Sequence, residues 1–573
     1  MSRRAVLVFL VAGVLLAGGV VPWTVAPDRL TARVGRQLAD GYGLRLTATG
    51  RTSIAFLPVP RIKFDRVSLT ADDGRELVGG AVLRGEIRVL PLLGGRVELG
   101  DLSLTGGRIR IERDETGRTN WDAPVGRLVA NALAGSHDEL RLRRLSVTGT
   151  EVDLVGPDTE AAASLRVSNL LLSWPQPGSG LDMVGTFGWR SETVEATVSV
   201  PRPLAILRGG RDRVEARVSS RALSLSADGE LGSEPAWRFA GATTAAAPSL
   251  GRALALVGGS VPLPVLDRVA QLSGEAVASG GEIAWAQMRL DLGGDRLDGA
   301  LAFGLLPPFK VRATLAADRL DLGWLLPSLP PAFAGWAFDP AGTAALDLRL
   351  SASAARVGPL RIGDAAVSLL AAGGRMDASL LRAEIEGGLL KGRVTAVAEG
   401  GRADIKAQTS FEKIDLAALS SRLGRRSVLS GTARGQANLE ATGAPADDLV
   451  QHLQGRASGN IRNGEFAWPP FAASAPAPDW PAGRMAFDEA GFQLNVVDGV
   501  AEIVDARTEL ASARLSLAGS VSLAEGRLDL RATAERPGGD ALRGRSTLEI
   551  VGPWDVPTVQ PVGPDTGANR PTR

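Results

Sequence analysis

Alternation of apolar and polar residues with a period of two dominates this 573-residue chain from Leu44 onward. The clearest case is Gly95–Arg113, where polar residues separate apolar ones. Because successive side chains of a strand point to opposite faces, this period predicts β-strands with one apolar face. We interpret its Gly-Asp and Gly-Gly pairs as tight turns between three strands of an antiparallel sheet. The apolar positions are Val97, Leu99, Leu102, Leu104, Ile109 and Ile111.

The same pattern returns 43 residues later, so that Leu140–Leu154 aligns with Val97–Ile111. Both copies read apolar-x-apolar, two residues, apolar-Ser-apolar-Thr-Gly, two residues, apolar-x-apolar. A repeated strand unit predicts a sheet that grows by the addition of similar units. Similar alternation occurs at Leu346–Leu350, Val394–Ala398 and Leu515–Leu530, the last beginning with Leu515 and Leu517.

Helices are expected to be few and short. The chain has 70 Gly, 34 Pro and only 5% aromatic residues, which suits many short strands. The segment after the N-terminal apolar run could seat the sheet on a membrane, or pack on the first strands. Phe466–Ala482 is predicted to be a linker or loop, and the tail from Pro553 to be extended or disordered. Helical spacing occurs at Pro27–Tyr42, Val125–Ala134, Pro248–Val257, Leu416–Leu423 and Ala446–Leu453.

An uncharged apolar run from Ala5 to Val25 follows Arg3 and Arg4. About 20 residues at 1.5 Å each match the ~30 Å hydrocarbon core of a bilayer, so we predict one transmembrane helix. A cleaved signal peptide is the alternative, although the run exceeds the usual length of such a segment. The two arginines indicate a cytoplasmic N-terminus and place the bulk of the chain in the periplasm of a cell with two membranes.

The sequence contains few residues that could form a catalytic site. There is no Cys, and the two histidines, His137 and His452, are too few for a metal site or a convincing triad. The net charge of +1 argues against a nucleic-acid partner. We therefore predict no catalytic residue, no cofactor and no metal, and expect no enzyme. A pair of distant carboxylates acting on an envelope polysaccharide remains the alternative.

An apolar strand face must be covered by something. A second sheet covers it in a compact sandwich, whereas acyl chains could cover it on a long sheet. An acyl chain of about 16 carbons gains roughly 0.8 kcal/mol of free energy per buried methylene, or on the order of 12 kcal/mol in a bilayer. A groove must recover this free energy to lift the chain out, so it needs a continuous apolar lining. The residues that we predict to line a lipid groove are Val97, Leu99, Leu102, Leu104, Ile109, Ile111, Leu515 and Leu517.

Ordered motifs near both ends resemble the AsmA family. The N-terminal set includes a Pro-Leu-Leu-Gly-Gly run, an Ile/Val-x-Leu strand and the Gly-x-x-Asn-Trp closure at Gly117–Trp121. Gly459–Pro470 departs from the regular family pattern, and the middle of the chain matches only in its strand character. The segments that carry the resemblance are Phe56–Leu69, Arg88–Trp121, Val428–Gly443, Leu453–Gly455, Phe487–Ile503, Arg514–Thr533 and Ile550–Pro561.

The resemblance implies a mainly β protein with a long, curled sheet, held in the bacterial inner membrane by one span. It implies a role in outer-membrane biogenesis, with phospholipids as partners and possibly outer-membrane components. A scaffold that binds no lipid and assists outer-membrane protein assembly and targeting is the alternative. The expected parts are an anchor (1–26), an AsmA-like N-terminal region (27–124), a β-rich middle with short helices (125–383), an AsmA-like C-terminal region (384–552) and a disordered Pro-rich tail (553–573).

Overall fold

Most of the chain is described by a computed structural model. The described residues are 23–24, 27–57, 59–87, 99–114, 118–134, 140–156, 163–176, 178–234, 236–257, 267–304, 309–323, 344–399, 402–424, 427, 429–443, 446–468, 483–510, 513–535, 545–554 and 556–562.

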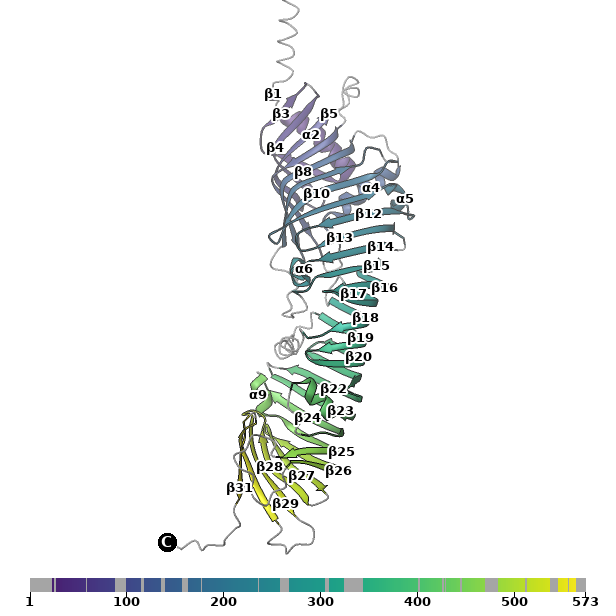
Figure 1. The fold of residues 1–573 in the computed structure, drawn as a ribbon. Coiled ribbons are helices and arrows are strands. Elements are labelled where there is room, and N and C mark those ends of the chain that lie inside the picture. The colour runs from purple at the N-terminus through teal and green to yellow at the C-terminus, as the bar shows by residue number, and fades with distance from the viewer. Residues whose placement is uncertain are drawn as a thin grey trace, which may run out of the picture. The chain divides into compact units, whose positions relative to one another are not determined.

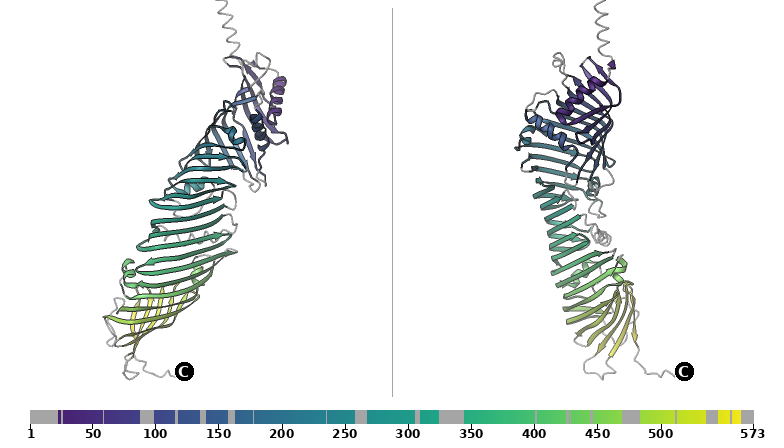
Figure 2. Two further views of the ribbon diagram at one scale, coloured as in Figure 1. Left: turned by 90° about the vertical axis from the view of Figure 1, so that its right-hand side faces the viewer. Right: turned by 180° about the vertical axis from the view of Figure 1, so that it is seen from behind.

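The chain divides into two compact units. Their helices and strands are labelled in Figure 1. Unit 1 comprises Met1–Ser260 and Val269–Gly280, and unit 2 comprises Val261–Arg268 and Gly281–Arg573. Strands make up most of the described residues, which confirms the mainly β prediction. The sheet within each unit is curved (Figure 2).

Unit 1 begins with a small strand cluster and continues as a regular sheet. Its strands β8 to β15 pair antiparallel in chain order. Its elements are β1 (Trp23–Thr24), α2 (Pro27–Tyr42), β2 (Leu44–Ala48), β3 (Thr52–Ala55), β4 (Arg61–Ala71), β5 (Glu76–Ile87), β6 (Leu99–Thr105), β7 (Arg108–Glu112), α4 (Asp122–Ala134), β8 (Leu140–Val155), β9 (Ala163–Ser173), β10 (Leu181–Trp189), β11 (Glu192–Val200), α5 (Pro203–Leu207), β12 (Arg211–Ser219), β13 (Ser224–Gly232), β14 (Arg238–Ala247), α6 (Leu250–Val257) and β15 (Ala270–Ser279).

The strands of unit 2 pair regularly, and neighbours in the chain are neighbours in the sheet. All of these pairs are antiparallel except β18–β19, which is parallel. Its elements are β16 (Glu282–Leu292), β17 (Asp295–Gly304), β18 (Phe309–Asp321), β19 (Ala344–Val357), β20 (Leu360–Ala372), β21 (Arg375–Ile385), β22 (Gly388–Glu399), β23 (Arg402–Asp415), α8 (Leu416–Arg422), β24 (Thr432–Gly443), α9 (Ala446–Gln451), β25 (Gln454–Trp468), β26 (Gly483–Val497), β27 (Val500–Leu510), β28 (Arg514–Ser522), β29 (Arg527–Glu535), β30 (Arg545–Pro553) and β31 (Thr558–Val562).

The prediction of a purely antiparallel sheet is wrong, because β6 and β7 both run parallel to β8. Strand β6 continues through Gly100-Asp101, where the pairing shifts register, so this pair forms no tight turn. The chain does not reverse direction at Gly106-Gly107 either, because β6 and β7 lie end to end along the same partner strand, β8. When a strand contains a bulge, two apolar residues three positions apart can lie on the same face of that strand. The sequence pattern alone led to the interpretation of this spacing as a turn.

All five helices predicted from spacing are present, as α2, α4, α6, α8 and α9. The five-residue helix α5 was not predicted, because its Pro-Leu-Ala-Ile-Leu sequence is too short to show a helical period. The tail prediction is wrong for Thr558–Val562, which pairs with β30 as the strand β31. The predicted linker begins later than expected, since β25 runs to Trp468, and residues 469–482 lie outside the described part.

The predicted membrane span falls largely outside the described residues, which include only Trp23 and Thr24 of it. These two residues form β1 and pair with Ile54 and Ser53 of β3. Among the residues that the structure describes, no helix has the length and hydropathy needed to cross a bilayer.

Helix α2 packs on the first strands, which was one of its two expected roles. Val34 is fully buried and Leu38 is 6% exposed. Both belong to a core that includes Phe64 and Leu77 of β4 and β5, and α2 lies across this part of the sheet (Figure 2). Helix α4 is held beside α2 by two side chains that donate to α2 carbonyl oxygens, Arg127 to Ala39 at 3.3 Å and Asn131 to Gly41 at 2.6 Å.

Candidate functional site

A single row of register partners runs across one face of unit 1 from β1 to β15, through every strand except β2 and β7. All but one of its side chains are apolar or glycine, and none is charged. We call it the central row of unit 1: Trp23, Ile54, Ile62, Gly85, Leu102, Leu145, Leu172, Met183, Val198, Ala216, Ala227, Thr243 and Gly274.

Burial divides this row into two parts. At the α2 end Ile54 and Ile62 are 8% and 1% exposed, because the packed core covers them. Farther along, Val198 and Ala227 are only half-buried. The polar exception, Thr243, donates its hydroxyl to the Gly274 carbonyl oxygen at 3.0 Å. The row therefore combines a closed end with a partly accessible apolar surface.

Unit 2 has a corresponding row that crosses β16 to β30 without a charged or polar side chain. Most of its members in β19 to β24, such as Leu369 and Val394, are half-buried. We call it the central row of unit 2: Trp285, Leu301, Ala313, Leu348, Leu369, Ala378, Val394, Ala407, Leu439, Gly455, Val496, Ala501, Val521, Leu528 and Gly552.

The opposite face of unit 2 is polar, as strand alternation requires. There charged side chains pair across neighbouring strands, for example Arg289 of β16 with Asp298 of β17 at 3.3 Å. The row of partners next to the central row, beginning in β19, is Arg349, Ser368, Ser379, Arg393, Gln408, Asn438, Arg456, Asn495, Glu502, Ser520 and Asp529. The sheet thus separates a charge-free face from a charged one.

Six of the predicted lining residues have described side chains, and these lie in packed clusters. Leu104 is 6% exposed in the core of unit 1, and Leu102, Ile109 and Ile111 pack against it. Leu515 and Leu517 belong to a separate cluster in unit 2. Val97 lies outside the described residues, as does the side chain of Leu99.

The half-buried apolar residues of the middle strands were not among the residues predicted to line a lipid groove. Val198, Ala227, Leu369 and Val394 carry the same period-two signal as the N-terminal copies. Their exposure depends on what packs over them, which alternation alone does not specify.

The Asn-Trp closure of the N-terminal motif has a structural explanation. Asn120 is 2% exposed, and its side chain both accepts from the Glu112 amide and donates to the Arg110 carbonyl at 3.0 Å. The Trp121 indole also donates to Arg110, at 2.9 Å. Together they saturate the backbone of β7 at Arg110–Glu112, where β8 is its one partner among the described strands, so the motif caps a sheet edge.

One buried carboxylate lies at the edge of the unit 1 face. Asp212 is 4% exposed and accepts from the backbone amide and the guanidinium of Arg202, the latter at 3.1 Å. Burial raises its pKa, but the hydrogen bonds from Arg202 outweigh burial and hold that pKa below the ordinary value. Asp212 thereby fixes α5 to β12.

Metal ligands are not gathered anywhere in the described ranges, where no group of three or more His, Asp or Glu side chains is placed to hold an ion. His452, the residue after α9, lies 3.1 Å from Asp448 of that helix. His137 lies outside the described residues. The predicted absence of an enzyme activity stays a prediction.

The fold and these two rows define a mainly β protein with an apolar sheet face that a charge-free row crosses in each unit. The AsmA family model matches residues 1–247 and 325–506, and the chain belongs to the AsmA family, whose members are membrane-associated proteins of the bacterial envelope. The match extends farther into the middle than the quoted motifs do, and it ends before Arg514–Thr533. Comparison with curated proteins and with solved structures gives no match.

Proposed function

We propose that this protein is anchored in the inner membrane, lies in the periplasm, and carries phospholipids along its apolar sheet face toward the outer membrane. One observation carries the proposal. The central row runs from β1 to β15 in unit 1, past β2 and β7, and from β16 to β30 in unit 2; it has no charged side chain, and its middle members are half-buried rather than covered. Acyl chains gain free energy from such a surface in proportion to the area that they cover.

Photo-crosslinking tests this proposal directly. A photoreactive amino acid at Val198 or Leu369 lies on the central row, whereas one at Thr197 or Ser368 lies on the opposite face of the same strand. We expect phospholipid adducts at the first two positions and none at the two controls. Adducts at neither pair, or equal yields at both, would overturn the proposal.

A scaffold for outer-membrane protein assembly is the second candidate. The packed cores around Leu104 and Leu515 favour it, because there the apolar face is filled by the protein's own side chains. The same crosslinking experiment separates the two functions. A scaffold gives protein adducts at Leu369 or on the polar face, with no lipid attached.

A further inference from the structure

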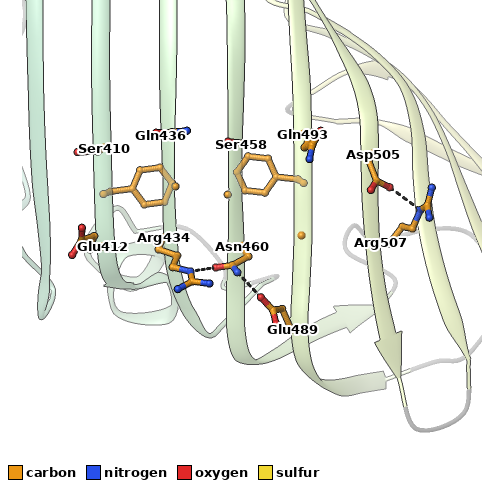
Figure 3. A pocket seen from close by; sticks show the side chains of 15 residues that line it. Ser410, Glu412, Arg434, Gln436, Ser458, Asn460, Glu489, Gln493, Asp505 and Arg507 are labelled. Carbon is orange, nitrogen blue, oxygen red and sulfur yellow. Dashed lines mark hydrogen bonds and ion pairs between the residues drawn. The ribbon is translucent and has the colours of Figure 1, made fainter.

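The polar face of unit 2 contains a pocket of about 610 Å³ between β23 and β27 (Figure 3). It lies on the face opposite the central row. On β24, for example, the pocket residue Gln436 and the central-row residue Leu439 are an odd number of positions apart, so their side chains point to opposite faces. Its volume is within the range of small-ligand sites. A function of this pocket would therefore be independent of the proposed lipid path.

The upper row of the pocket is uncharged from β23 to β26, and it ends on β27 at Asp505, the register partner of Gln493. Ser410, Gln436, Ser458 and Gln493 are successive register partners on β23, β24, β25 and β26. Within the described part of the chain, no hydrogen-bond partner is found for any of these four side chains. Each hydroxyl or amide both donates and accepts, so the row offers unused groups of both kinds.

The lower row is charged but internally satisfied. Arg434 donates to the Asn460 side-chain oxygen at 2.6 Å, and the Asn460 amide donates in turn to Glu489. Arg507 lies 2.7 Å from Asp505. The guanidinium groups are thus already engaged, and the carboxylates outnumber them among the lining residues. This arrangement disfavours a phosphate or another anion.

Gly491 leaves a gap in the lower row of the pocket. It stands between Asn460 and Arg507 in the register, and a Cβ atom added there would meet nothing within 4 Å. The missing side chain leaves space for a ligand without strain in the backbone. The same property makes the site easy to block by substitution.

From these observations we infer that the pocket binds an uncharged, linear oligosaccharide lying across the strands. Sugar hydroxyls both donate and accept, as the Ser and Gln side chains do. The four partners of the upper row are spaced by about 4.8 Å and span about 14 Å. A pyranose ring is close to this spacing in length, so one ring meets one strand.

Calorimetric titration of the full-length protein in phospholipid nanodiscs, prepared without glycoside detergents, tests the inference. The probes are chitotetraose, maltotetraose and inorganic phosphate. We expect at least one tetrasaccharide to bind and phosphate not to bind. Gln436→Ala with Gln493→Ala should weaken binding by about tenfold or more, through the loss of two hydrogen-bonding side chains.

Gly491→Leu should abolish binding by filling this gap while leaving the thermal unfolding midpoint unchanged. Gln408→Ala and Asn438→Ala are matched controls, since they lie on the same face of β23 and β24 outside the pocket, and they should bind like the parent protein. The inference is overturned if neither sugar binds, if only phosphate binds, or if the controls lose as much affinity as the pocket variants.

Discussion

Leu104 of β6 and Val147 of β8 are direct partners across a parallel strand pair, and they are 6% and 3% exposed. They lie 43 residues apart, as do Arg108 and Glu151, which form an ion pair on the neighbouring strand segment. Parallel pairing places equivalent residues of two successive units opposite each other. The sequence repeat therefore reflects a shared requirement of both strands for the same buried face.

Gly107→Ala should destabilise this junction. Gly107 has φ +76°, and an added Cβ would lie 2.7 Å from the backbone of Ala81. We expect a loss of about 2–3 kcal/mol from backbone strain and steric overlap together. Hydrogen exchange of the β8 amides reports the change, because the loss should appear there as faster local opening.

Gly106→Ala is the matched control for that substitution. Gly106 has a similar φ of +66°, but a Cβ there would meet nothing within 4 Å. It should cost only about 1 kcal/mol, the strain of a left-handed residue. Equal effects of the two substitutions would show that the contact with Ala81 contributes nothing.

Asn120→Ala should loosen the capped edge of β7. The substitution removes two hydrogen bonds from a side chain that is 2% exposed and leaves the Glu112 amide and Arg110 carbonyl without those partners. We expect a loss of about 1–3 kcal/mol in urea unfolding monitored by circular dichroism. Arg118→Ala, in the same loop but exposed, should change stability by less than about 0.5 kcal/mol.

The sequence shows which face of most strands is apolar, but bulges hide the continuity of that face. Phe411 and Ile414 share a face of β23 across a register shift in its pairing with β24. A three-residue spacing of apolar residues occurs both at a bulge within one strand and at a turn between two strands, so the local sequence pattern does not distinguish a bulge from a turn. The parallel β6–β8 and β18–β19 pairs are likewise set by long-range pairing rather than by local sequence.

The candidate site was predictable as a type of surface and not as a set of residues. Leu104 and Leu369 have the same alternation, yet Leu104 is buried in a core while Leu369 is half-buried. The difference arises from α2 and the strands packed against the N-terminal end of unit 1, a tertiary feature. The polar pocket escaped prediction because its residues, such as Gln436 and Gln493, look like ordinary solvated positions in sequence.

Acid should destabilise the α5 region through Asp212. Its pKa is lowered in the folded state, so its carboxylate stabilises the fold above the ordinary Asp pKa of about 3.9. That contribution disappears as the pH falls through the lowered pKa. Unfolding midpoints measured between pH 7 and pH 3 should therefore decline in the parent protein.

Asp212→Asn should reduce this acid dependence and lower stability at pH 7, because a charged acceptor for Arg202 is lost. The expected loss is on the order of 2 kcal/mol. Asp228→Asn is a suitable control, since Asp228 also pairs with an arginine but is exposed. If Asp212→Asn left the acid decline intact, another carboxylate would be responsible.

A charge placed on the central row should remove bound phospholipid without unfolding the chain, provided that the position is half-buried. Leu104→Asp is unsuitable, because a carboxylate in that core unfolds the protein whether or not lipid binds. Ala407→Asp in β23 meets the requirement, and Gln408→Asp, the next residue, places the same charge on the opposite face. Mass spectrometry of detergent-free protein should find about tenfold less phospholipid with Ala407→Asp, because desolvating a carboxylate against acyl chains is unfavourable, and parental amounts with Gln408→Asp. Equal lipid content in the two variants would mean that lipid, if bound, does not lie on this face.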